Sequence, residues 1–150
     1  MPPTLPPPLA KERLESLKIG LLAASVALLS FGLLDQGVLL LPPLASLLTH
    51  TRGIGTIGLT AAIVGLSGFL FGVTYRYVVR RDRNPHLKSG VVLAFGLVRG
   101  LAQLETGVRL AEVLPLLGWL VVESLLLFAI VGAVVDVALT TGKVTPFPAE

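Results

Sequence analysis

Apolar residues fill four long stretches of this chain, over residues 19–41, 57–79, 89–104 and 116–139, with short polar segments between them. An α-helix rises about 1.5 Å per residue, so about 20 apolar residues cross the roughly 30 Å hydrocarbon layer of a bilayer. The pattern therefore predicts an all-α, polytopic membrane protein, a bundle of four transmembrane helices.

The third stretch, residues 89–104, fits this prediction least well. It is short, and it carries Arg99 among its apolar residues. It either crosses the bilayer or forms a re-entrant amphipathic segment, in which case the chain has three spans. The second stretch is the clearest span, because Arg76 near its end is its only charge.

Prolines and glycines mark the boundaries of the membrane domain. Residues 1–17 are expected to form a flexible tail, because five prolines lie within residues 1–8 and proline lacks an N–H donor. A proline pair at 42–43 ends the first helix, and Gly142 followed by Lys143 closes the last. The transmembrane domain is thus predicted over residues 18–142, with a short tail at 143–150.

The composition excludes several classes of protein. With 53% hydrophobic and only 14% charged residues, a soluble globule of 150 residues would expose too much apolar surface. The net charge of +3 comes from bases clustered between apolar stretches, which argues against a nucleic-acid partner. The chain has no cysteine, so it has no disulfide and no cysteine metal ligand.

A basic loop separates the second and third stretches. It is formed by Arg76, Arg80, Arg81, Arg83 and Lys88. Together with the flanks of the two chain ends, this side of the predicted bundle holds nine of the twelve Lys and Arg residues, against two on the other side. The positive-inside rule then places both termini on the cytoplasmic or stromal side. The loop is also a candidate site for anionic lipid.

Small residues recur along one face of the second stretch and again in the third. Such spacing allows neighbouring helix backbones to approach closely. The face serves either packing within the bundle or docking of a partner helix. Its residues are Ala61, Gly65, Gly68, Gly72, Gly96 and Gly100.

Four charged residues interrupt the apolar stretches: Asp35, Arg99, Glu123 and Asp136. A charge at mid-membrane costs about 2.5 to 3.5 kcal/mol on insertion scales unless it is paired or hydrated. If the last two stretches form an antiparallel hairpin, Arg99 and Glu123 lie at similar depth, which predicts an ion pair. The pair either fixes helix register, lines a proton or ion pathway, or contacts a partner protein or lipid headgroup. The two aspartates lie nearer the helix ends, within reach of loop bases such as Arg52.

Motifs of enzymes are not found in the sequence. It contains no nucleophile elbow, phosphate loop, zinc-protease motif or dinucleotide fingerprint. Neither histidine lies within a predicted span, where it could ligate a membrane cofactor. We therefore expect no catalytic residue, no cofactor and no metal site.

The segment from Asn84 to Gln103 resembles a block of uncharacterised small integral membrane proteins found in cyanobacteria and in the plastids of plants and algae. The resemblance implies a photosynthetic membrane, such as a cyanobacterial thylakoid, or the plasma membrane, and a role beside larger membrane complexes. It implies no substrate. The proline-rich start lacks the features of a transit peptide, which favours a bacterial member.

Two functions follow as expectations. The first is a non-catalytic accessory subunit, or an assembly or stability factor, that contacts the bilayer and other membrane subunits. The alternative is a small channel or transporter component that uses Arg99 and Glu123.

Overall fold

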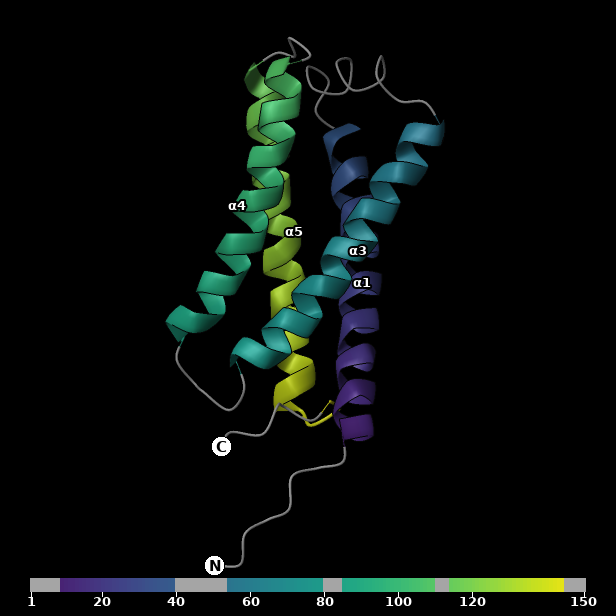
Figure 1. Cartoon of the computed structure of the whole chain (residues 1–150). Coiled ribbons are helices and arrows are strands. Elements are labelled where there is room, and N and C mark those ends of the chain that lie inside the picture. The colour runs from purple at the N-terminus through teal and green to yellow at the C-terminus, as the bar shows by residue number, and fades with distance from the viewer. Residues whose placement is uncertain (1–8, 40–53, 80–84, 110–113, 145–150) are drawn as a thin grey trace, which may run out of the picture.

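The computed structural model describes residues 9–39, 54–79, 85–109 and 114–144. These residues form four antiparallel helices (Figure 1), which are α1 (Leu9–Leu39), α3 (Ile54–Val79), α4 (Pro85–Arg109) and α5 (Leu114–Thr140). All four are long and apolar enough to cross a membrane. The predicted all-α transmembrane bundle is confirmed, and the protein is an integral membrane protein.

Helix α4 extends beyond its apolar stretch at both ends. Its 25 residues span roughly 37 Å, more than the hydrocarbon layer requires. Pro85 suits a first helical position, and Gln103 and Glu105 are good helix formers, so the helix continues through polar sequence. The length of α4 favours a fourth span over the re-entrant segment.

Helix α1 begins earlier than the composition of the tail suggests. It starts at Leu9, so residues 9–17, which were expected in the flexible tail, are helical. Lysine, glutamate and arginine are favourable helix residues, and Glu12 in the first turn complements the helix dipole. Residues 1–8 lie outside the described part of the chain.

Helix α5 ends at the glycine that the sequence indicates. Gly142 has a φ of 73°, a left-handed conformation that glycine adopts without steric cost. Its N–H donates to the carbonyl of Leu139 at 3.4 Å, and the N–H of Lys143 donates to the carbonyl of Ala138 at 3.1 Å. These bonds satisfy carbonyls that the end of a helix leaves without partners.

The helices pack as two hairpins, α1 with α3 and α4 with α5. Helix α5 also contacts α1 and α3, so it packs the second hairpin against both helices of the first. An aromatic cluster joins them, in which the ring centroid of Phe71 on α3 lies 5.3 Å from those of both Phe95 on α4 and Phe128 on α5. The core continues from this cluster toward the end of the bundle where α1 and α4 begin.

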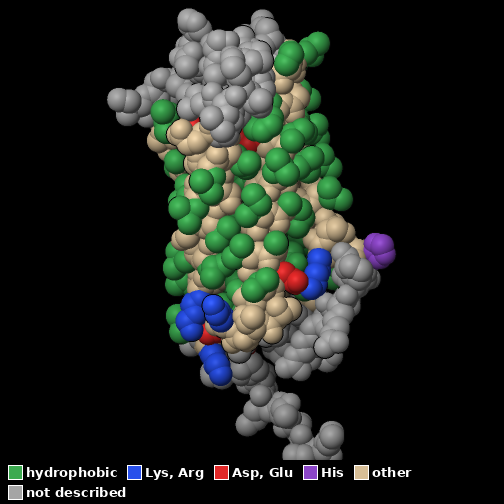
Figure 2. Space-filling model, turned by 180° about the vertical axis from the view of Figure 1, so that it is seen from behind, with side chains coloured by type: hydrophobic (Ala, Val, Ile, Leu, Met, Phe, Trp, Pro, Cys, Tyr) green, Lys and Arg blue, Asp and Glu red, His purple; other side chains and the backbone are tan. Residues whose placement is uncertain are grey.

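Apolar side chains also cover the outside of the bundle. Figure 2 shows them over the middle of one face, with the Lys and Arg side chains gathered toward one end. Each of the four helices contributes exposed leucine, isoleucine or valine side chains. This is the surface that a protein embedded in lipid requires.

Candidate functional site: polar contacts between the helices

Polar side chains from all four helices meet at one end of the bundle. This is the end where α1 and α4 begin and where α3 and α5 finish (Figure 1). We call this group the polar clamp and the end that holds it the clamp end. The clamp consists of Glu12, Ser16, Tyr75, Arg76, Tyr77, Lys88 and Asp136.

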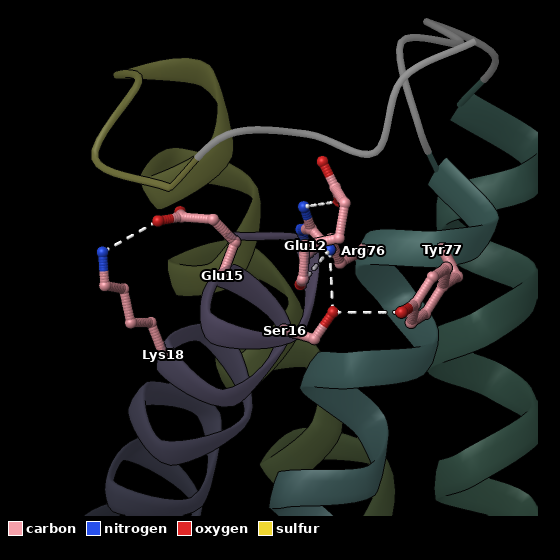
Figure 3. A network of polar contacts seen from close by, with 6 residues as sticks. All are labelled: Glu12, Glu15, Ser16, Lys18, Arg76 and Tyr77. Atoms are coloured by element: carbon pink, nitrogen blue, oxygen red, sulfur yellow. Dashed lines mark hydrogen bonds and ion pairs between the residues drawn. The ribbon is translucent and has the colours of Figure 1, made fainter. Parts of the chain in front are cut away.

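Arg76 is the centre of the contact between α1 and α3 (Figure 3). Its side chain is 0% exposed, and its Nη2 donates to Glu12 Oε2 at 2.6 Å. Its Nη1 donates to Ser16 Oγ at 2.7 Å and to the Glu12 carbonyl at 3.3 Å. The Ser16 hydroxyl in turn donates to the Tyr77 hydroxyl at 3.2 Å. A buried guanidinium is tolerated when it is paired and hydrogen-bonded in this way.

Lys88 and Asp136 make the corresponding contact between α4 and α5. Lys88 Nζ lies 2.6 Å from Asp136 Oδ1, and both side chains are half-buried. The Tyr75 hydroxyl on α3 donates to the same oxygen at 3.4 Å. Asp136 therefore connects the second hairpin to the first.

The predicted basic loop needs correction at two of its five positions. Arg76 is a buried residue of α3, and Lys88 lies in the first turns of α4. Both are ion-paired with carboxylates of the same chain, so their charges are compensated internally. The physical reason is that α3 continues to Val79, where Tyr75 and Val79 pack into the core. The other three positions, Arg80, Arg81 and Arg83, lie outside the described residues.

A second polar group lies within the membrane-spanning part of the α4–α5 hairpin. Glu123 is 7% exposed and lies near enough for its charge to act on Arg99, and their pairing stays a prediction. The Nε of Arg99 is buried without a hydrogen-bond partner in the described part of the chain. Nearby on the same two helices, the Ser124 hydroxyl donates to Gln103 Oε1 at 2.6 Å. The two helices thus share several polar groups at membrane depth.

Five of the six small residues predicted as a packing face lie against neighbouring helices. Gly65, Gly68 and Gly72 face α1, while Gly96 and Gly100 face α5. A Cβ built at Gly72 would lie 2.7 Å from the carbonyl oxygen of Ile19, so the backbones are in close contact. The sixth residue, Ala61, is half-buried. Within the described residues these positions are used for packing inside the bundle.

The sequence analysis did not identify the partners of the charged residues in the polar clamp. Glu12 and Ser16 were assigned to the tail, although their spacing of four continues the buried face of α1 through Gly20, Ala23 and Ala27. That spacing is the signal that could have found them. Asp136 was expected near loop bases such as Arg52, but it pairs with Lys88; Arg52 lies outside the described residues. Asp35 is half-buried toward the end of α1.

The chemistry of the clamp is that of a fixed junction, since each of its charged groups binds an opposite charge on a neighbouring helix. His86, which lies outside the predicted spans, is exposed in the first turn of α4. Among the described residues, no three His, Asp or Glu side chains are grouped so that they could hold a metal ion.

No protein family model matches the chain, and no curated protein or solved structure is significantly similar to it.

Proposed function

We propose that the protein is a non-catalytic membrane subunit, or an assembly or stability factor, of a larger membrane complex. The observation that supports this most directly is the structure of α4. One side of this helix packs on α5 through Gly96 and Gly100, while an apolar face that runs from beside this contact to the far side of the helix is exposed. That exposed face consists of Leu93, Leu97, Val98 and Leu101.

The polar clamp supports a scaffold in preference to a moving part. Paired charges tie α1 to α3, where Arg76 is buried, and α4 to α5, where the pair is partly exposed, at the same end. Sliding of these helices would separate opposite charges, at the greatest cost in the buried pair. The segment that resembles the cyanobacterial and plastid proteins, Asn84 to Gln103, overlaps α4 over most of its length. This overlap is consistent with a photosynthetic membrane as the location and with α4 as the docking helix.

Co-purification tests the proposal. We expect the tagged protein, extracted from its own membrane in mild detergent, to migrate with a stoichiometric larger complex on native electrophoresis, with the subunits identified by mass spectrometry. A photo-crosslinking residue at Val98, which is 71% exposed on α4, should capture one of these subunits. The matched control is the same residue at Leu29, which is 69% exposed on α1. Migration as a lone small oligomer, or equal capture from both positions, would contradict the proposal.

A transport component is the second candidate, because a buried carboxylate and a guanidinium nitrogen without a hydrogen-bond partner in the described residues lie together at membrane depth. Intramembrane ionisable residues often mark ion or proton pathways. If this candidate is correct, Glu123→Gln abolishes ion or proton flux in reconstituted vesicles while the bundle and its complexes remain intact. If the protein is a scaffold, wild type and variant vesicles show the same background flux.

A further inference from the structure

The first turns of α1 carry an exposed surface that combines bases with leucines. Three leucines, Leu14, Leu17 and Leu21, are each about half exposed. At 100° per residue, Lys11 and Lys18 flank them on one side of the helix and Arg13 on the other. All three bases are exposed. We call these six residues the α1 surface.

The charges of the clamp end leave the α1 surface net positive. Glu12 faces inward to the buried Arg76, and Asp136 is held by Lys88. Glu15 is 8% exposed and pairs with Lys18 at 2.8 Å. Lys11 and Arg13 make no ion pair within the described part of the chain. The described carboxylates of this end are therefore ion-paired, while Lys11 and Arg13 remain outside.

We propose that the α1 surface binds the headgroup of an anionic phospholipid. Its leucines contact the acyl chains, and its bases reach the phosphate at the membrane surface, as long basic side chains at helix ends do. The described bases of the predicted loop, Arg76 and Lys88, are compensated by carboxylates of the chain itself. Among the described residues, Lys11 and Arg13 on α1 are bases of this end that make no such pair.

A tryptophan reporter tests this in reconstituted vesicles. Trp119 is the single tryptophan of the chain, so Trp119→Phe gives a silent background for Leu17→Trp. We expect brominated phosphatidylglycerol to quench this reporter with an apparent affinity about fivefold or more above that of brominated phosphatidylcholine, because each nearby base contributes a factor of about that size. Replacing Lys11, Arg13 and Lys18 by glutamine should bring the ratio close to one.

Two controls locate the effect. Leu33→Trp places the reporter on the same helix near the opposite end of the bundle, where Leu33 is 74% exposed, and should show no preference. Replacing Arg80, Arg81 and Arg83 by glutamine should leave the preference at position 17 in place.

Equal quenching by the two lipids at position 17 would overturn the proposal. So would a preference that survives the changes on α1, that disappears with the changes in the loop, or that is equally strong at position 33. Far-UV circular dichroism establishes that each variant is folded.

Discussion

Arg76 and Glu12 lie 64 positions apart in the sequence, yet Nη2 of the first lies 2.6 Å from a carboxylate oxygen of the second. Arg76 is fully buried, whereas Glu12 retains some exposure. An arginine in this position cannot lose its charge, so its burial depends on the partner. The pair explains why a helix rich in charges at its start packs against α3.

Removing one member of this pair should be more harmful than removing both. We expect Glu12→Ala to lower the free energy of unfolding by about 3 kcal/mol, because it removes the carboxylate that lies 2.6 Å from a buried guanidinium. The double change Glu12→Leu with Arg76→Leu should recover most of this loss. Thermal unfolding in detergent measures both. The control is Glu105→Ala, which breaks an exposed pair with Arg109 and should cost at most about 1 kcal/mol.

The same comparison applies at membrane depth. We expect Glu123→Ala to destabilise the bundle more than Arg99→Leu combined with Glu123→Leu, because the single change leaves Arg99 without its opposing charge. Unfolding in detergent again provides the measurement. If the single and double variants unfold alike, Glu123 does not compensate Arg99.

The glycines of α3 should differ in their tolerance of a methyl group. An alanine Cβ at Gly68 would lie 2.5 Å from the Cβ of Ala27 and 2.9 Å from the carbonyl oxygen of Ala23. We expect Gly68→Ala to force α1 and α3 apart and to cost about 1 to 3 kcal/mol of unfolding free energy. Gly65→Ala is the matched control on the same face, since its nearest neighbour would be a leucine methyl at 3.5 Å. The control should be neutral or slightly stabilising, because alanine favours the helix. Equal effects would mean that the close approach at Gly68 is absent.

The two ion pairs of the clamp should respond differently to salt. Salt screens exposed charges far more than buried ones. Lys88 and Asp136 are half-exposed, so the loss of stability caused by Lys88→Met should shrink as the salt concentration rises. The loss caused by Glu12→Ala should change little, because Arg76 is fully buried. Unfolding temperatures at low and high salt provide the test, and a salt-sensitive Glu12→Ala would show that water reaches Arg76.

The positive-inside rule predicts the orientation of the bundle. Described bases outside the membrane-spanning middle concentrate at the clamp end, which should therefore face the cytoplasm or stroma. Because the chain has no cysteine, single cysteines report the orientation directly. If the protein lies in the plasma membrane, we expect a membrane-impermeant thiol reagent to label Arg109→Cys in intact cells. If it lies in a thylakoid, we expect the same labelling in sealed vesicles whose luminal face points outward. Lys143→Cys should be labelled only after permeabilisation, and the reverse pattern would invert the orientation.

The sequence predicts the number and kind of helices well, because hydropathy over some 20 residues reflects a property that each helix has by itself. The start of α1 and both ends of α4 were placed too far inward, since Glu12, Lys88 and Glu105 resemble loop residues when no partner is in view. Asp136 and Lys88 form a contact between distant positions, and a local pattern does not identify it. Matching depth along the α4–α5 hairpin, which predicts the pairing of Arg99 with Glu123, applies equally to Lys88 and Asp136 on the same two helices.

The distribution of the clamp contacts has a consequence for how the chain enters the membrane during synthesis. Glu12 and Arg76 belong to the first two described helices, and Lys88 and Asp136 to the last two. Each pair of helices therefore carries its own compensating charges into the bilayer. Helices α1 and α3 can pack together in the bilayer while the rest of the chain is still being synthesised. The Tyr75 hydroxyl then joins the two halves when Asp136 arrives with the last helix.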